Sequence, residues 1–286
     1  MSVESKPTHI TEKKFCWLPT FDIDVAFAYR HKPIFLLILR SMYELFQFQF
    51  KSLLERFKTL FLNQKDPYDT YGFIHSIHKN GIKPIFFWLV APSRNKYDTN
   101  ISPFNPEIKS LINKWSEIYD IGIHPSYTSN FNPENINTEK NILQNIITKP
   151  VTKSRQHYLM LKLPATYRRL IDNSITDDYT MGYHNTVGFR AGTSFPFLWY
   201  DLENEQTTTL RVHPFCIMDV ALKNHMELSS NEAWLITKKI IDTLKKADGI
   251  FMSIWHNSSF SEIHGWSGWK EFYQEIDDYC HAINEM

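Results

Sequence analysis

The sequence predicts an α/β fold in which parallel strands alternate with outer helices and form a distorted (β/α) barrel. Six to eight short apolar runs, suited to buried strands, are separated by amphipathic segments suited to helices. The chain has 286 residues, 43% of them hydrophobic, which is enough to bury a large core. No Gly/Ser-rich linker divides it. We therefore expect a flexible polar arm at residues 1–14 and a single domain at residues 15–286.

The individual elements follow from apolar runs and from apolar spacing. Continuous apolar runs, typical of strands buried on both faces of a parallel sheet, cover residues 16–24, 83–90, 121–125, 154–163, 187–190, 210–218 and 249–255. Apolar side chains three and four residues apart predict helices at residues 33–61, 66–79, 107–119, 164–171, 231–247 and 268–283, and a helical centre within 130–149.

The longest amphipathic segment, at about residues 33–62, is predicted as a helical insertion in the barrel. Leu36, Leu45 and Phe57 belong to its apolar positions, while Arg40 and Lys51 belong to the charged ones. The spacing predicts one long helix or two consecutive helices. Its aromatic-rich face suits packing on the core of the domain, which we favour, an interface with a second subunit in an oligomer, or peripheral contact with a membrane surface.

Composition narrows the class of partner. Lys+Arg and Asp+Glu both number 31, so the formal net charge is zero and no basic field favours nucleic acid. Three scattered cysteines without a CxxC pair favour a reducing compartment. The first 14 residues lack an apolar signal core, and the apolar run at 34–39 is too short to span a bilayer. We predict a cytoplasmic protein with no transmembrane segment, acting on a small molecule or glycan.

Two carboxylates at the end of the first strand are the feature around which the predicted site is built. Asp22 and Asp24 are two residues apart, so an extended strand would project both to one face. Adjacent carboxylates repel unless a cation or a shared proton lies between them. One interpretation is a divalent metal held by one Asp while the other acts as a base. The other is a turn whose Asp side chains cap backbone N–H groups.

Further ionisable residues fall at the ends of later strands. His124, Arg190, Asp219 and His256 each follow an apolar run, as Asp22 and Asp24 do. In barrels and doubly wound sheets, functional side chains gather at the carboxyl ends of the strands. Two His and one Asp are also a common zinc ligand set with an open fourth position. We therefore expect these side chains to form one site.

Four short motifs occur in a fixed order along the chain. They are Thr-Phe-Asp-Ile-Asp at 20–24, His-Pro-Ser-Tyr-Thr at 124–128, Gly-Phe-Arg-Ala-Gly-Thr at 188–193 and Ile-Trp-His at 254–256. Together they resemble the motifs of the polysaccharide deacetylases of the NodB-homology type, carbohydrate esterase family 4. The run at 177–201 resembles a divergent bacterial branch associated with surface polysaccharides. Two departures stand out: Ile23 separates the carboxylates, and Thr128 occupies the place of the second motif's second histidine.

The resemblance implies a distorted (β/α) barrel and a bound divalent metal, Zn before Co, Ni or Mn. Asp24 and His124 would be metal ligands. His157, from the following segment, is our candidate for the third ligand in place of the missing motif histidine.

The resemblance also implies an acid and a base. Asp22 would be the general base, with Arg190 orienting it and stabilising its charge, and His256 the general acid. Asp219 is a candidate partner of His256 or Arg190. A backbone N–H in the loop at 124–127 would help to stabilise the oxyanion. Tyr127, Trp88 and Trp255 are candidate sugar-stacking side chains, although core packing is the ordinary use of such residues.

The implied function is removal of an N-acetyl group from an amino sugar in surface polysaccharide biosynthesis. Because we predict a cytoplasmic location, a nucleotide- or lipid-linked precursor is the expected form of this carbohydrate substrate. The alternatives are a degenerate member that binds glycan or acts as a scaffold, and a hydrolase of a non-sugar C–N bond. A base and an acid retained together argue against the degenerate alternative.

Overall fold

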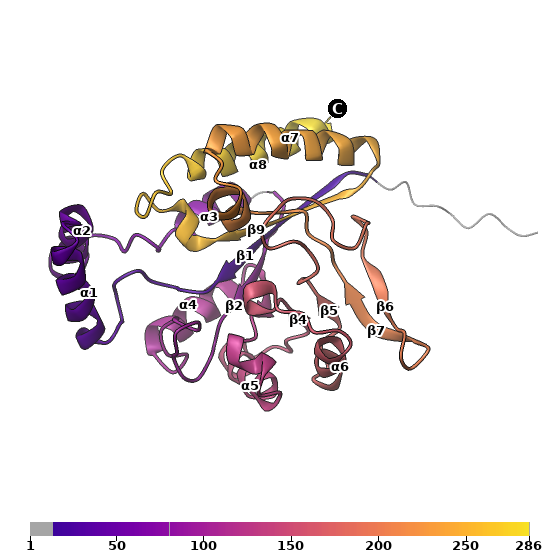
Figure 1. Ribbon diagram of the computed structural model, residues 1–286, viewed down its shortest axis with the longest axis horizontal. Helices are drawn as coiled ribbons and strands as arrows, with labels where there is room; N and C mark the ends of the chain where they lie inside the picture. Colours follow the sequence, from indigo (N-terminus) through magenta and orange to yellow (C-terminus); the bar gives the residue numbers. More distant parts are fainter. Residues whose placement is uncertain (1–13, 80, 286) are drawn as a thin grey trace, which may run out of the picture.

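The core of the protein is one curved, mostly parallel sheet. The computed structural model describes residues 14–79 and 81–285, so the predicted arm, apart from Lys14, lies outside the described residues. The strand order is β6-β7-β5-β4-β3-β2-β1-β9-β8, and only the β6–β7 pair is antiparallel (Figure 1). The strands are β1 (Cys16–Ile23), β2 (Ile85–Trp88), β3 (Asp120–Ile123), β4 (Lys153–Ser154), β5 (Asp177–Asp178), β6 (Phe197–Asp201), β7 (Gln206–Val212), β8 (Ile217–Met218) and β9 (Ile250–His256). The predicted α/β fold with parallel strands is confirmed.

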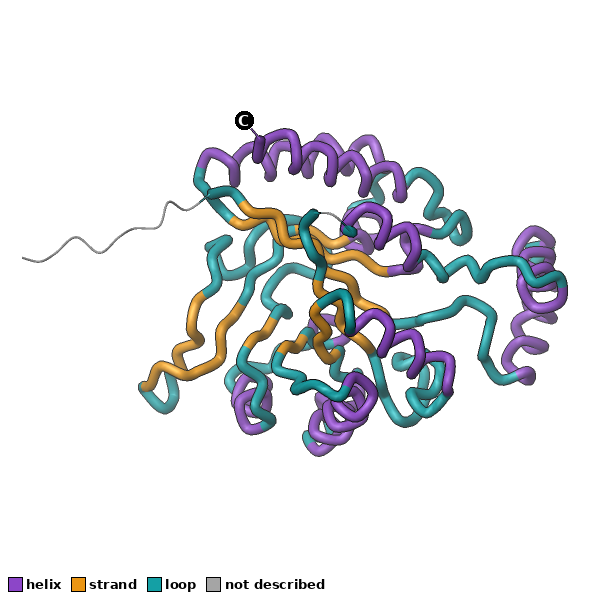
Figure 2. The backbone as a smooth tube through the Cα atoms, turned by 180° about the vertical axis from the view of Figure 1, so that it is seen from behind, coloured by secondary structure: helices purple, strands orange, loops and turns teal. Residues whose placement is uncertain are grey.

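Helices cover the outside of the sheet, as the tube view in Figure 2 shows. They are α3 (Tyr71–His78), α4 (Pro106–Ser116), α5 (Glu134–Ile147), α6 (Ala165–Asp172), α7 (Ser230–Lys246) and α8 (Trp269–Glu285). In Figure 1, α7 and α8 lie along one side of the molecule, and α4, α5 and α6 along the other. The start of α7 is fixed by a capping box, in which Ser229 and Glu232 each bond to the other's backbone N–H.

The central strand β1 positions the two aspartates. It pairs with β2 on one side and β9 on the other, and the register places Asp22 beside His256. Trp17 and Phe21 anchor the strand, because both are buried and both rings lie 5.8 Å from the ring of Tyr273 on α8. The carboxyl end of β1 is therefore held rigidly by the core.

A glycine on β3 makes room for an aromatic ring beneath the site. A Cβ at Gly122 would lie 2.5 Å from the Phe87 ring and 3.0 Å from the Lys153 carbonyl oxygen, so no larger residue fits without movement. The Phe87 ring in turn lies 4.5 Å from the guanidinium of Arg155, which stacks over it. Gly122 thus helps to support the arginine that reaches the site.

Several predicted elements differ from those observed. The strand predicted at 154–163 ends at Ser154, because the N–H groups of Gln156 and His157 are donated to the Thr180 hydroxyl and to the Pro125 carbonyl instead of to a ladder. The strand predicted at 187–190 is a loop, in which Gly188 has a φ of 110°. The strand predicted at 210–218 is divided into β7 and β8.

The predicted insertion forms a hairpin of two helices, α1 (Ile34–Phe46) and α2 (Phe50–Phe61), which stands apart from the sheet in Figure 1. Of the two alternatives left open by the sequence, one long helix or two consecutive helices, the structure has the second. Packing of their apolar face on the core, which the sequence favoured, is wrong, because Ile34 is 72% exposed and Phe46 is 76% exposed. Among the described residues, no helix is long and apolar enough to cross a membrane.

Candidate metal centre

Asp22 and Asp24 occupy different environments at the end of β1. Asp22 is buried, and its Oδ1 accepts a hydrogen bond of 2.8 Å from Nη1 of Arg155, which is also fully buried. Asp24 lies just beyond the strand, and its side chain is 30% exposed. The two carboxylates are therefore not equivalent: Asp22 is buried in an ion pair with an arginine, whereas Asp24 is partly exposed.

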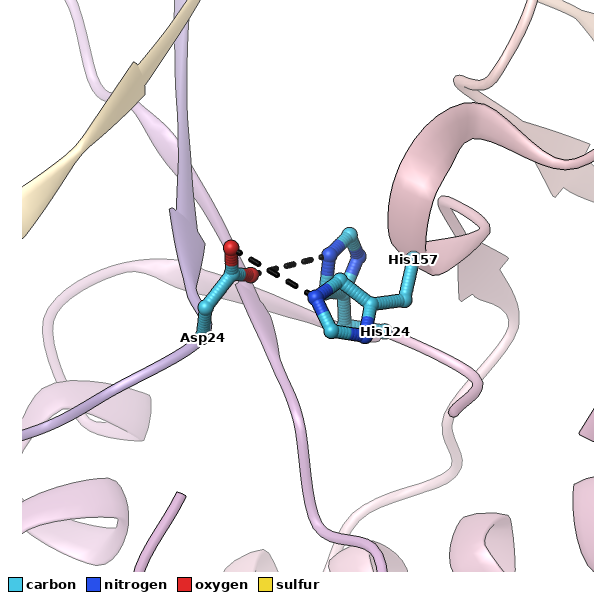
Figure 3. Close-up of side chains that lie close together, drawn as sticks. All are labelled: Asp24, His124 and His157. Carbon is cyan, nitrogen blue, oxygen red and sulfur yellow. Dashed lines mark ion pairs between the residues drawn. The ribbon is translucent and has the colours of Figure 1, made fainter. Parts of the chain in front are cut away.

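Asp24, His124 and His157 converge on one point (Figure 3). Asp24 Oδ1 lies 3.1 Å from His124 Nε2, and Asp24 Oδ2 lies 3.6 Å from His157 Nε2. One ligand atom from each residue lies within 4.8 Å of the other two. The structure thus brings together the three residues predicted as ligands, although Asp24 follows β1, His124 follows β3 and His157 lies in the segment after β4.

Both imidazoles are held through their second nitrogen. Nδ1 of His124 lies 2.7 Å from the Arg155 carbonyl oxygen, and Nδ1 of His157 lies 3.0 Å from Oδ1 of Asp98. These contacts fix each ring with Nε2 facing Asp24. A carbonyl or carboxylate behind each histidine is the usual arrangement of a metal-ligating imidazole, because it fixes the tautomer and raises the basicity of the free nitrogen.

The charges in the cluster shift one another's pKa values. Burial opposes ionisation of Asp24, but His157 and His256 outweigh it and hold the Asp24 pKa well below its usual range. Burial likewise opposes protonation of His157, but Asp24 and Asp98 outweigh it and raise the pKa of His157 to about 9. The negative charge of Asp24 and Asp98 therefore favours a positive charge beside them. Protonated imidazoles or a bound metal ion can supply that positive charge.

The donor set fits a divalent metal. The buried Oδ1 of Asp24 has no hydrogen bond within the described part of the chain, despite the closeness of His124 Nε2. An unbonded buried carboxylate oxygen facing two imidazole nitrogens is costly unless a cation lies between them. Two nitrogens and one oxygen, with room for a further ligand in the cavity, match the ligand types and number of a catalytic zinc site.

His256 lies beside Asp22 at the end of β9, the strand that pairs with β1 on the side opposite β2. Its Nε2 is 3.5 Å from Asp24 Oδ2, and its Nδ1 is 2.8 Å from Asp219 Oδ1. Buried Asp219 also accepts hydrogen bonds from the N–H of His256 and the hydroxyl of Ser259. Burial lowers the pKa of His256, but Asp219 and Asp24 outweigh this and raise it to about 10. Of the two partners considered for Asp219, the structure places His256 beside it.

The arginine beside Asp22 is Arg155 and not Arg190. Arg190 is exposed in the loop that follows Gly188, so the predicted contact with Asp22 is absent from the described structure. Arg155 projects inward from the end of β4, donates to the Tyr179 carbonyl at 2.9 Å and stacks on Phe87. The short motif around Arg190 was misleading because it does not form a strand, and Arg190 is not among the residues that line the cavity.

The loop at 124–127 does not offer the backbone N–H that was predicted to stabilise an oxyanion. The N–H groups of His124, Ser126 and Tyr127 are donated to the Trp88 carbonyl, to Glu139 and to Asp98, at 3.0, 2.9 and 2.8 Å. Residue 125 is a proline and has no N–H. This loop therefore has no free backbone donor for an oxyanion.

A cavity of about 340 Å³ opens over the cluster. Its lining combines the site carboxylates and histidines with a few apolar side chains: Asp22, Asp24, His124, Gln156, His157, Tyr158, Leu159, His184, Met218, Val220, His225 and His256. Tyr158 has a φ of 58° and Leu159 a φ of 52°, a conformation unusual for non-glycine residues. This turn presents Tyr158, 55% exposed, at the cavity wall.

Aromatic side chains beside the cavity differ from those predicted. Trp88 and Trp255 are fully buried in the core, so their predicted role as stacking surfaces is wrong. Tyr127 is partly exposed and stacks on Tyr97 at a centroid distance of 4.0 Å, and both rings meet Tyr158 edge-on. Three tyrosines thus form an aromatic cluster next to His157.

Sequence reasoning missed Arg155 and Asp98. Arg155 stands two residues before His157, directly after a strand, so its position was a usable signal. Asp98 lies in the polar loop between β2 and α4, where nothing in the sequence separates it from other polar residues. It binds both His157 Nδ1 and the N–H of Tyr127, so it joins the third candidate ligand to the loop that carries the second.

Similarity to known proteins is confined to structure. No family model and no curated protein matches the sequence. A protein from Mycobacterium smegmatis assigned as a polysaccharide deacetylase superposes over 96% of this chain and 87% of its own, with a TM-score of 0.55 and 11% identity. The chain has the polysaccharide deacetylase fold. The resemblance predicted from the motifs is confirmed at this level.

Two further solved structures share the fold. The Puue allantoinase covers 96% of this chain and 89% of its own, with a TM-score of 0.58 and 11% identity. A 4-alpha-glucanotransferase from Thermococcus litoralis covers 93% of this chain but only 38% of its own, with a TM-score of 0.50 and 11% identity. The fold thus occurs in proteins with different activities, so function must be argued from the site.

Proposed function

We propose that the protein is a metal-dependent hydrolase that removes an N-acetyl group from an amino sugar. The observation that carries the proposal is the convergence of Asp24, His124 and His157 in a cavity flanked by a carboxylate with its own arginine and a histidine with its own aspartate. The shared fold with a protein assigned as a polysaccharide deacetylase supports the same class of reaction.

Asp24, His124 and His157 would hold one divalent metal, with zinc favoured by the mixed nitrogen and oxygen donors. When bound, zinc would polarise the acetamide carbonyl and lower the pKa of a water molecule in the cavity. Asp98 and the Arg155 carbonyl keep the two imidazoles in place for this task.

Asp22 would act as the general base. Its carboxylate lines the cavity, lies 3.9 Å from His124 Nε2 through Oδ2, and keeps that oxygen free because Arg155 binds Oδ1. An oxygen that is anchored on one side and open on the other can accept a proton from an attacking water. Arg155 is therefore a positioning residue, the role that the sequence had given to Arg190.

His256 would act as the general acid. Its Nε2 faces the cavity, while Asp219 holds Nδ1 and keeps the ring protonated. A protonated imidazole can donate to the nitrogen of the departing amine, which is too basic to leave without a proton. Because Asp22 and His256 are partners in register on adjacent strands, base and acid lie side by side along one edge of the sheet.

Tyr127, with Tyr97 and Tyr158, would supply the surface on which a sugar ring stacks. The substrate would be a nucleotide- or lipid-linked precursor of a surface polysaccharide, handled in the cytoplasm. Both the linkage and the location stay predictions. A second candidate is hydrolysis of a non-sugar C–N bond, because an allantoinase shares the fold at a similar TM-score.

The decisive experiment combines metal content with product release. Purified protein, loaded with zinc and dialysed, should retain about one metal ion per chain by mass spectrometry. Acetate release from N-acetylhexosamine substrates, free and nucleotide-linked, should depend on that metal. His157→Ala should lose both, whereas His31→Asn, at an exposed histidine outside the cavity, should lose neither.

The other outcomes are equally informative. Bound metal without acetate release, together with ammonia or amine release from cyclic amides or ureides, would favour the non-sugar hydrolase. Protein that binds the sugars but takes up no metal would contradict the proposal and favour a catalytically degenerate binding protein.

A further inference from the structure

The α1–α2 hairpin exposes most of the large apolar side chains found on the protein surface. Of the 26 exposed large hydrophobic residues in the described chain, 15 lie between Ile34 and Leu62. Phe46 and Phe48, at the tip between the helices, are 76% and 78% exposed. An apolar patch of this density on an isolated element indicates an interaction surface.

The exposed apolar surface of α1 is wider than one helix-packing stripe. At about 100° per residue, its exposed apolar positions between 34 and 46 cover an arc of about 200°. A helix that packs on one neighbour needs a stripe only about 100° wide. An environment that surrounds the helix on two sides fits this arc better than a single protein face.

Three polar side chains of the hairpin, those of Glu44, Arg56 and Thr59, are buried instead. Glu44 and Arg56 are 1% and 4% exposed and form an ion pair of 2.6 Å. Arg56 also donates to the Ser41 hydroxyl at 2.8 Å, and Arg40 donates to Glu44 at 3.2 Å. A polar interior with an apolar exterior is the reverse of a water-soluble hairpin, and it is the arrangement that polar residues adopt among helices in lipid.

The charge of the segment complements an anionic lipid surface. Residues 30–65 contain seven Lys and Arg against two Glu, a net charge of +5, whereas the whole chain is neutral. The rest of the chain therefore carries −5. On α2, Lys51 is exposed and Lys58 half-exposed, two turns apart and both beside the stripe formed by Phe50, Leu54, Phe57 and Phe61. Cations along the border of an apolar stripe suit a helix lying at the headgroup level.

We propose that the α1–α2 hairpin is a monotopic membrane anchor that inserts its apolar arc into one leaflet of an anionic bilayer. The helices have 13 and 12 residues, so each is about 20 Å long, shorter than the hydrocarbon core of about 30 Å. The hairpin therefore enters one leaflet without crossing the membrane. The buried Arg56–Glu44 pair stays on the side that faces the protein.

The experiment measures lipid binding directly and does not depend on catalytic activity. Full-length protein is sedimented with vesicles of phosphatidylcholine alone or mixed with phosphatidylglycerol. We expect binding to the mixed vesicles that weakens with salt. The double variant Phe46→Ser/Phe48→Ser should bind at least tenfold more weakly, because its two tip side chains no longer enter the bilayer. Circular dichroism checks that the variant is folded.

A matched control removes apolar side chains of similar exposure elsewhere. Leu202 and Leu235 are 77% and 61% exposed, on the β6–β7 turn and on α7. Leu202→Ser/Leu235→Ser should bind vesicles like the wild type. Lys51→Gln and Lys58→Gln should each weaken binding to anionic vesicles about fivefold and leave the residual binding to neutral vesicles unchanged.

Two results would overturn the proposal. One is wild-type binding to vesicles no stronger than that of the Phe46→Ser/Phe48→Ser variant. The other is a dimer in sedimentation equilibrium that the same variant dissociates, with no vesicle binding, since a second copy of the chain would then be the occupant of the apolar arc.

Discussion

The cavity and the α1–α2 hairpin reverse the ordinary placement of side chains in opposite ways. In the cavity, three ionisable side chains are held by a partner from another element: Asp22 by Arg155, His157 by Asp98 and His256 by Asp219. In the hairpin, large apolar groups are exposed. Buried charge is tolerated where partners are fixed, whereas exposed apolar surface persists where something outside the chain covers it.

The largest loss of activity should come from removing the negative charge of Asp24, which faces the imidazoles of His124 and His157. Asp24→Asn keeps the shape of the side chain but removes its negative charge. We expect metal binding to be lost and acetate release to fall by at least about 10³-fold, because metal and water activation are lost together. Metal content and single-turnover rates measure this. A variant that keeps both its metal and more than a tenth of the rate would exclude Asp24 as a ligand.

Replacing Arg155 and Arg190 one at a time tests which of the two arginines positions the proposed general base, Asp22. Arg155→Gln should leave Asp22 buried and unpaired, and should lower the free energy of unfolding by about 3 kcal/mol while reducing kcat. Arg190→Gln should change the free energy of unfolding by less than about 0.5 kcal/mol, because the side chain is exposed. Urea unfolding of both variants gives the comparison. Equal effects would mean that the Arg155–Asp22 contact is not a positioning contact.

The Asp219→Asn variant tests the acid through its pH dependence. The Asp219 carboxylate raises the pKa of His256, so its removal should lower that pKa and shift the alkaline limb of kcat to lower pH by about one unit. The favourable pairing is present in full below the ordinary histidine pKa of 6.5 and is lost as pH rises toward about 10. The variant should accordingly lose stability at neutral pH and little at pH 10. An unshifted alkaline limb would exclude His256 as the acid.

Breaking a buried ion pair of the same kind in the hairpin should affect global stability much less than Arg155→Gln does. Arg56→Gln removes the partner of buried Glu44, as Arg155→Gln removes that of Asp22. Because the hairpin stands apart from the sheet, we expect local opening, with the global free energy of unfolding changed by less than about 1 kcal/mol. Hydrogen exchange should speed up in residues 34–61 and stay unchanged in β1. A global loss comparable to that of Arg155→Gln would show that the hairpin unfolds together with the core.

The sequence predicted best the features that depend on strand ends. Asp22, Asp24, His124, Asp219 and His256 meet because each lies at or just after the carboxyl end of a strand of a parallel sheet, and that rule needs no knowledge of side-chain contacts. Arg190 failed because its run of apolar residues is too short and too glycine-rich to form a strand. The role of Asp98 could not be predicted, because Asp98 lies in a loop and the sequence does not show which residues a loop side chain contacts after folding. Packing of the hairpin on the core was predicted wrongly, because apolar spacing identifies an apolar helix face but does not show which surface covers that face.

The groups proposed to transfer protons lie on the paired strands β1 and β9, whereas the groups proposed to contact the substrate lie on loops. Asp22 and His256 are fixed by ladder hydrogen bonds on neighbouring strands, and a slip of either strand by one residue would turn its own side chain away from the cavity. The three tyrosines belong to loops that follow β2, β3 and β4. Evolution can therefore replace or lengthen those loops, and so change which molecule is held, while the proton-transferring groups keep their spacing.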